Sequence, residues 1–246
     1  KNGGTDLTET NIAAADQATD TPTNNFCTMN PVDNYWTVNT FAEGNCQVIT
    51  ASSGYTGAQA TMGVAAGKWY FEFSPISKTG DADEYTVGVV GAPFTGTGQT
   101  TWHPATGYGY VGSNGNTYNN DSVDTSGYGD TYTAGDIIGV ALDVTNSKLY
   151  WSKGGTWQNS GDPTSGSTGT GAEAITAVAS TPTGFYLPSC AFAANSASAT
   201  MSLNFGGCPA FAISSGNADA NGYGNFEYAP PTGYYAICSK NLGEFG

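Results

Sequence analysis

The sequence contains no arginine. Its basic side chains are six lysines, set against twenty aspartates and glutamates, which gives a formal net charge of -14. Proteins that bind nucleic acids neutralise phosphates with clustered Lys and Arg, and arginine is the usual bidentate reader of guanine. A surface this acidic repels polyanions, so the composition excludes nucleic-acid binding.

Long apolar runs are absent as well. No stretch approaches the roughly 18 consecutive apolar residues of a membrane-spanning helix. The N-terminus lacks the basic-then-apolar layout of a secretion signal. Membrane insertion is therefore not expected. The chain begins at Lys1 rather than at methionine, which suggests a fragment or a processed product of a longer protein.

Residues that commonly bind metals are few and scattered. The cysteines form an odd set without a C-x-x-C pair, namely Cys27, Cys46, Cys190, Cys208 and Cys238. We predict buried thiols rather than a zinc site or a disulfide framework. Asn119-Asn120-Asp121 lacks the D-x-[DN]-x-[DN]-G pattern of a calcium loop. No metal and no cofactor is predicted.

Small and turn-forming residues dominate what is present. Thirty-five glycines and fifteen tyrosines favour short strands joined by turns, and helix should be scarce. Residues 1–25 hold only two large apolar side chains, Leu7 and Ile12, and predict an N-terminal arm or linker that packs on a neighbour. Aromatic residues begin at Phe26, and no later boundary splits the chain. Residues 26–246 are therefore expected to form one domain.

Short apolar runs bounded by turn residues predict a series of strands. The clearest are 68–74, 85–90, 137–143, 148–152, 184–192 and 200–205. Between the third and the fourth, Val144-Thr145-Asn146-Ser147 is a polar turn of hairpin length.

Alternation within these strands predicts which side chains face inward. In the first strand Trp69, Phe71 and Phe73 share one face, and that face is core. Tyr70 and Glu72 share the other face, which is either wet or covered. Inward rows are also expected for Leu149 with Trp151 and for Met201 with Leu203 and Phe205. Such rows must meet across a sandwich about 10 Å thick.

Several of these segments resemble a known family. GKWYFEF, YTVGVV, YGY, GFYLPSCAF and LNFGGCPAF, together with YTAGDIIGVALDVTNSKLYWSKGGTWQNS at 132–160, resemble in their order the core strands of a SPRY (B30.2-like) domain. The resemblance implies an all-β fold, a two-sheet antiparallel concanavalin-like sandwich. It also implies an interaction surface made by loops between strands and no catalytic activity.

The flanking segments extend this resemblance. NNFCTMNP at 24–31 and PPTGYYAICSKNL at 230–242 resemble SPRY-containing virion proteins of tailed bacteriophages, including fibre and other surface proteins. The resemblance covers roughly residues 24 to 246.

The carboxylates bear on whether the protein is an enzyme. Glycoside hydrolases of this architecture need two carboxylates about 5 to 10 Å apart across a cleft. Asp81, Asp83 and Glu84 lie in a polar turn and are interpreted as solvated charge. Glu72 points away from the core aromatics, and a structural hydrogen bond to a neighbouring strand is its preferred interpretation. We therefore predict no enzymatic activity.

Aromatic and amide side chains gather between residues 102 and 132. The residues predicted to contact a ligand are Trp102, His103, Tyr118, Asn119 and Tyr128. Aromatic faces can stack on sugar rings while nearby amides bind the hydroxyl groups. The lone His103 is expected in loop packing or ligand contact and not in a Ser/His/Asp system. Tyr108 and Tyr110 share one side of a strand and are interpreted as part of the sandwich.

These observations lead to one functional hypothesis and two alternatives. We expect a non-enzymatic domain on the surface of a virion, as a fibre or capsid-decoration module. Its expected partners are other virion proteins, copies of itself and host surface glycan or another receptor. The alternatives are a carbohydrate-active enzyme on the same architecture, and a cellular surface adhesin or filament subunit.

Overall fold

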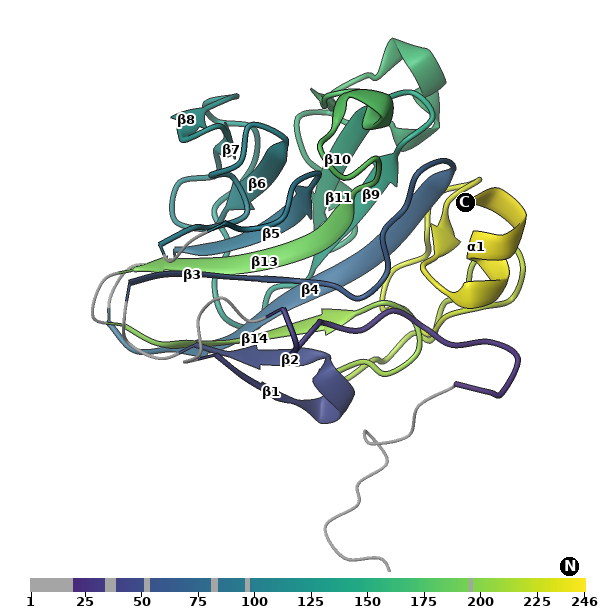
Figure 1. Cartoon of the computed structure of the whole chain (residues 1–246), viewed down its shortest axis with the longest axis horizontal. Coiled ribbons are helices and arrows are strands. Elements are labelled where there is room, and N and C mark those ends of the chain that lie inside the picture. Colours follow the sequence, from purple (N-terminus) through teal and green to yellow (C-terminus); the bar gives the residue numbers. More distant parts are fainter. Residues whose placement is uncertain (1–19, 34–38, 51–53, 81–83, 96–97, 195–196) are drawn as a thin grey trace, which may run out of the picture.

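Two β-sheets stacked on each other form the body of the protein in the computed structural model (Figure 1). The structure describes residues 20–33, 39–50, 54–80, 84–95, 98–194 and 197–246. Neighbouring strands run antiparallel except for one short parallel pair, β15 with β4. The predicted two-sheet antiparallel sandwich is confirmed.

The larger sheet has nine strands among the described residues. Its main path is β1 (Thr40–Ala42), β2 (Gln47–Ile49), β14 (Ala199–Asn204), β4 (Lys68–Lys78), β9 (Ile138–Asp143), β10 (Lys148–Lys153) and β11 (Thr156–Trp157). Two short strands lie off this path: β12 (Glu173–Ala174) pairs with β10, and β15 (Tyr235–Ala236) pairs with β4.

The smaller sheet has six strands in the described part of the chain. Their order is β3 (Gly54–Gln59), β13 (Leu187–Ala194), β5 (Tyr85–Val90), β6 (Gly107–Val111), β7 (Thr117–Asn119) and β8 (Ser122–Val123). Helical structure is short, as expected: the 3-10 turns η2 (Glu43–Asn45), η3 (Pro163–Thr168) and η4 (Val178–Ser180), and the helix α1 (Ser239–Phe245).

The six predicted strands correspond to β4, β5, β9, β10, β13 and β14. β4 is longer than predicted, because β14 continues to pair with it as far as Lys78 after a register shift between Thr200 and Met201. β13 begins later than predicted, at Leu187. The predicted hairpin turn at 144–147 joins β9 to β10, with Ser147 in the left-handed region at φ 55.

The main core lies between the two sheets. The predicted inward row of β4, Trp69, Phe71 and Phe73, is completely buried there, together with the predicted rows of β10 and β14. Trp151 on β10 also donates a hydrogen bond from Nε1 to the carbonyl of Val87 on β5, at 3.0 Å. That bond joins the sheets directly, so the indole of Trp151 satisfies its only donor while its ring fills the core.

The outer face of the larger sheet is covered rather than wet. Tyr70, Ala141 and Tyr150 lie on this face and form a second buried cluster. They pack against side chains from both ends of the chain, namely Phe26, Phe226, Tyr234, Ala236 and Cys238. The C-terminal segment therefore forms part of the fold.

Glu72 joins this covering segment to the sheet. Its carboxylate is fully buried and accepts hydrogen bonds from the hydroxyl of Tyr70, the side-chain amide of Asn204, and the backbone N–H groups of Glu227 and Tyr228. Burial raises the pKa of Glu72, while these donors act in the opposite direction. Asn204 lies directly opposite on β14, so the predicted bond to a neighbouring strand is confirmed.

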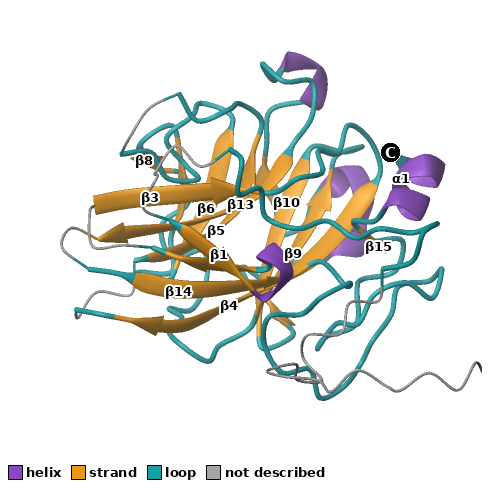
Figure 2. Ribbon diagram, turned by 60° about the horizontal axis from the view of Figure 1, so that its bottom comes forward, coloured by secondary structure: helices purple, strands orange, loops and turns teal. Residues whose placement is uncertain are grey.

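The described end of the predicted N-terminal arm contacts helix α1. Asn24 accepts a hydrogen bond from the backbone N–H of Lys240, and the backbone N–H of Asn25 donates to the hydroxyl of Ser239. Helix α1 also lies beside β15 (Figure 2). The rings of Phe245 on the helix and Tyr235 on the strand stack at 3.9 Å. Residues 1–19 of the predicted arm lie outside the described residues.

The five cysteines form no disulfide. Cys27, Cys46, Cys190 and Cys238 are buried, in agreement with the prediction of buried thiols, whereas Cys208 is partly exposed and differs from it. Among the residues that the structure describes, no helix has the length and apolar character needed to cross a bilayer.

Candidate binding site

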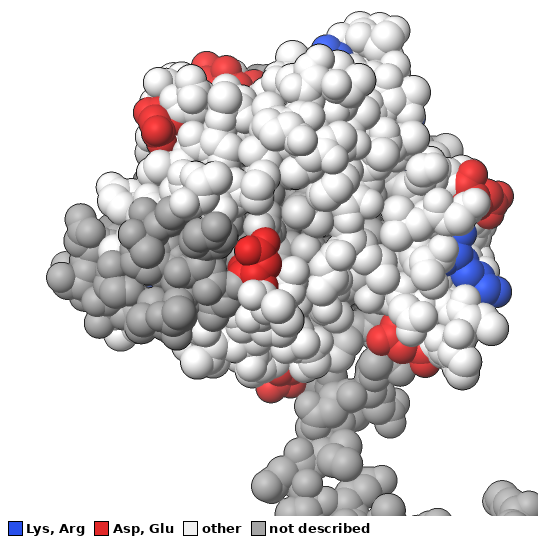
Figure 3. All heavy atoms as spheres, viewed as in Figure 1, with Lys and Arg blue, Asp and Glu red and all other residues white. Residues whose placement is uncertain are grey.

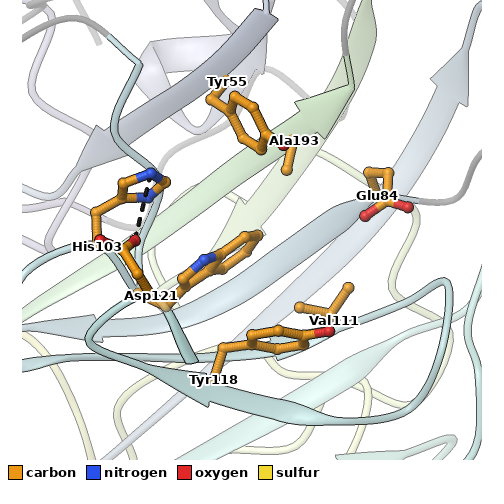
Figure 4. A pocket seen from close by; sticks show the side chains of 8 residues that line it. Tyr55, Glu84, His103, Val111, Tyr118, Asp121 and Ala193 are labelled. Carbon is orange, nitrogen blue, oxygen red and sulfur yellow. Dashed lines mark ion pairs between the residues drawn. The ribbon is translucent and has the colours of Figure 1, made fainter. Parts of the chain in front are cut away.

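A pocket of about 370 Å³ lies on the outer face of the smaller sheet. Its lining residues are Tyr55, Glu84, Trp102, His103, Val111, Tyr118, Asp121 and Ala193 (Figure 4). Strand alternation explains this composition, because Tyr110 points into the core and its neighbour Val111 points outward. Tyr55 and Ala193 are cross-strand partners on β3 and β13.

Aromatic rings follow one another along this pocket. The ring of Tyr55 meets His103 edge-on at 5.9 Å, His103 stacks against Trp102 at 6.1 Å, and Trp102 packs against Tyr118 at 5.3 Å. Trp102 itself is largely buried, whereas Tyr55 is 39% exposed. The pocket therefore presents aromatic surface supported by a rigid sheet.

His103 holds the loop between β5 and β6 in place. Its Nδ1 accepts a hydrogen bond from the backbone N–H of Thr100 at 2.9 Å. A backbone N–H can only donate, so Nδ1 carries a lone pair and the ring proton is on Nε2. Nε2 lies 3.4 Å from the carboxylate of Asp121, toward which it points its proton.

Asp121 reaches the pocket through a tight turn. Asn120 and Asp121 connect β7 to β8 and both have positive φ, at 48 and 60. Two consecutive left-handed residues are the signature of a type I′ hairpin, in which Asn and Asp are favoured. The Asn119-Asn120-Asp121 run therefore includes this hairpin turn. No group of three potential metal ligands occurs among the described residues.

The structure brings together three of the five predicted contact residues. Trp102, His103 and Tyr118 line the pocket. Asn119 is not among the lining residues, and its side-chain amide donates to the backbone carbonyls of Ala105 and Gly107 at 3.0 and 2.8 Å. Their contact with a ligand stays a prediction.

Tyr128 requires a correction, because it does not lie at the pocket. It is only 1% exposed and belongs to the main core, where its ring meets Trp151 at 5.4 Å. Its hydroxyl donates to the carbonyl of Gly171. An aromatic residue in a loop can pack inward as readily as outward, and the sequence around Tyr128 carries no alternation that decides between them.

Sequence reasoning missed Tyr55, Val111, Asp121 and Ala193, and it assigned Glu84 to solvated charge. Tyr55 and Ala193 have no neighbouring motif, and only the pairing of β3 with β13 brings them to the site. Asp81 and Asp83, the other acidic residues of that turn, lie outside the described residues.

A second hollow, of about 400 Å³, lies between the N-terminal segment and the C-terminal part of the chain. Phe26, Tyr223 and Lys240 contribute to it, and Lys240 lies over the ring of Tyr223 at 5.9 Å. The ammonium group of Lys240 thus already has an aromatic partner. The pocket on the smaller sheet is the stronger candidate because it combines a row of rings with two carboxylates.

The chain is similar to known proteins at the level of a family. A model of the SPRY domain matches residues 68–201, which is more than half of the chain. The chain belongs to the SPRY family. SPRY domains generally serve as protein–protein interaction modules and typically have no enzymatic activity. All pocket residues except Tyr55 lie within the matched part of this SPRY chain.

One solved SPRY structure is similar in fold to this chain. The SPRY domain of human HERC1 has a TM-score of 0.56 and 16% sequence identity, and the match covers 75% of this chain and 99% of that one. Another human SPRY domain has a TM-score of 0.47 and 15% identity, with 68% and 94% covered. A search of curated proteins found no match.

Proposed function

We propose that this SPRY chain is a non-enzymatic binding domain of a virion surface, in a fibre or a capsid decoration, and that it attaches to host surface glycan through the pocket on the smaller sheet. The observation that carries the glycan part is the row of rings from Tyr55 to Tyr118, with carboxylates beside it. Aromatic faces stack on the apolar faces of sugars, and carboxylates accept hydrogen bonds from their hydroxyl groups.

The virion part of the proposal has a different support. It rests on the similarity of residues 24–31 and 230–242 to segments of SPRY-containing virion proteins of tailed bacteriophages. On a particle, many copies of one weak site act together, so avidity supplies the strength that a small pocket lacks.

A glycan array with a matched pair of variants tests the site. Tyr55→Ala removes a 39% exposed ring from the pocket, whereas Ile76→Ala removes a side chain of equal exposure, 40%, from β4 of the other sheet. We expect Tyr55→Ala to weaken glycan binding by about tenfold, the upper range for an aromatic contact. Ile76→Ala should bind like the parent.

The same protein preparation tests the enzymatic alternative. Bound glycans are incubated with the protein and assayed for new reducing ends. Release of reducing sugar would reject a non-enzymatic domain, and equal binding by Tyr55→Ala and the parent would reject this pocket as the site.

Contacts with copies of itself and with other virion proteins form the remaining part of the proposal, and the arm is the proposed contact element. The test is deletion of residues 1–19, because Asn24 and Asn25 bind helix α1 and a longer deletion would disturb the fold. We expect the shortened protein to keep its melting temperature and to lose self-association in analytical ultracentrifugation. Unchanged association would reject this role for the arm.

A further inference from the structure

The pocket on the smaller sheet is lined by two acidic side chains. Glu84 and Asp121 both line it, and Figure 4 shows Glu84 on the side opposite to the His103–Asp121 pair. Within the described part of the chain, the Glu84 carboxylate has no hydrogen bond or ion pair. None of the described lysines lines the pocket.

His103 faces Asp121, on the side of the pocket opposite to Glu84 (Figure 4). Its Nδ1 accepts the backbone N–H of Thr100, so only Nε2 is left to donate, and Nε2 lies against Asp121. Asp121 therefore receives one N–H from His103. Its side chain is 62% exposed, so a ligand can reach it.

The rest of the molecule adds to this negative potential. The chain has a net charge of -14 and no arginine, and two of its lysines, Lys68 and Lys153, are paired with Asp143 and Asp136. The face shown in Figure 3 carries separate acidic patches and little basic surface. A cleft lined by one sign of charge concentrates ligands of the opposite sign.

We propose that the pocket selects glycans that carry a protonated amine, so that amino sugars bind in preference to their N-acetylated forms and sugars with carboxylates are disfavoured. This inference rests on the proposed glycan-binding function and names the ligand class. An ammonium group offers three donors to Glu84 and Asp121, and it is attracted to the faces of aromatic rings such as Tyr55. N-acetylation removes that charge, and a uronic acid brings the same charge as the site.

Three oligosaccharides of equal length provide the probes: oligomers of β-1,4-linked glucosamine, the same oligomers fully N-acetylated, and oligogalacturonate. Binding is measured by isothermal titration at neutral pH and low salt. We expect the glucosamine oligomer to bind about fivefold more tightly than its N-acetylated form, the size of a good solvent-exposed ion pair. The preference should shrink as salt is added, because exposed charges are screened.

Two charge-removing variants locate the effect. Glu84→Gln keeps the shape of the pocket and should abolish most of the preference for the amine, measured as the ratio of the dissociation constants of the N-acetylated and the amine oligomer. Glu43→Gln removes an equal charge from an exposed turn outside the pocket and should keep the preference.

The outcomes separate this inference from the function on which it rests. If the N-acetylated oligomer or the galacturonate binds as tightly as the amine, or if Glu84→Gln keeps the preference, the inference is wrong and glycan binding stands. If no array glycan and none of the three oligomers binds, the proposed function and the inference both fail.

Discussion

Replacing Glu72 by Gln tests how the C-terminal segment is held on the larger sheet. Oε1 accepts from the hydroxyl of Tyr70 and the N–H of Tyr228, and Oε2 accepts from Asn204 Nδ2 and the N–H of Glu227. Glutamine keeps the shape of the side chain but exchanges one oxygen for an NH2 group. With the NH2 group at the Oε2 position, Asn204 Nδ2 and the N–H of Glu227 both face a donor. With the NH2 group at the Oε1 position, the hydroxyl of Tyr70 can turn and accept, so only the N–H of Tyr228 faces a donor.

The expected loss follows from these contacts. A hydrogen bond to a charged group contributes about 1.5 to 3 kcal/mol, and the more favourable orientation of the amide loses one. The other bonds to the carboxylate are weakened, while the variant no longer buries a charge, so we expect a net loss of about 2 kcal/mol. For a domain of this size, that corresponds to a melting temperature lower by roughly 4 to 8 °C.

Thermal and urea unfolding, followed by circular dichroism, measure the loss. Hydrogen exchange adds a local test, because the amides of Glu227 and Tyr228 should lose protection in Glu72→Gln. Glu84→Gln is the matched control, since the Glu84 carboxylate has no hydrogen-bond partner among the described residues, and it should stay within about 0.5 kcal/mol of the parent. If Glu72→Gln stays within the same limit, the carboxylate does not anchor the segment and the reasoning is refuted.

Three further outcomes are expected. Gly88→Ala should lower the free energy of unfolding in urea by about 3 kcal/mol, because its new Cβ would lie 1.9 Å from a carbonyl oxygen of the neighbouring strand. Gly243→Ala on helix α1 meets no atom within 4 Å and should raise that free energy by about 0.5 to 1 kcal/mol. Equal effects of the two substitutions would contradict this. Burial raises the pKa of Glu173, so its contribution to stability is full below the ordinary carboxyl pKa of 4.5 and is lost as pH rises through the raised value. Glu173→Gln should therefore show a flatter dependence of unfolding free energy on pH, and an unchanged slope would argue against it. A small thiol reagent should modify the partly exposed Cys208 in the native protein and Cys190 only after unfolding, as peptide mass spectrometry would reveal; early labelling of Cys190 would conflict with its burial.

The strands that the sequence predicted are those with strict alternation. In β4 every second residue from Trp69 to Phe73 is a large aromatic, and a period of two has only one regular structure that buries such a row. β1, β2 and β15 escaped notice because each has two or three residues, too few to show a period. Their existence depends on the longer strands with which they pair.

The residues of the candidate site were likewise predicted from the sequence only in part. Trp102, His103 and Tyr118 were identified from an aromatic segment near in sequence, and the fold keeps them together on one side of the smaller sheet. Tyr128, from the same segment, turned into the core, because a loop residue has no fixed face. Tyr55 reached the pocket only through the pairing of β3 with β13.

The sequence by itself determined the all-β class, the inward rows of the long strands and the acidic character of the surface, because these follow from local period and composition. Only the tertiary structure decided that the outer face of the larger sheet is covered by the two ends of the chain, and that Glu84 and Asp121 share a pocket with aromatic rings. The physical reason is that hydrogen-bonded pairing of strands and the packing of a returning segment join residues far apart in sequence, and no local pattern encodes which of them meet.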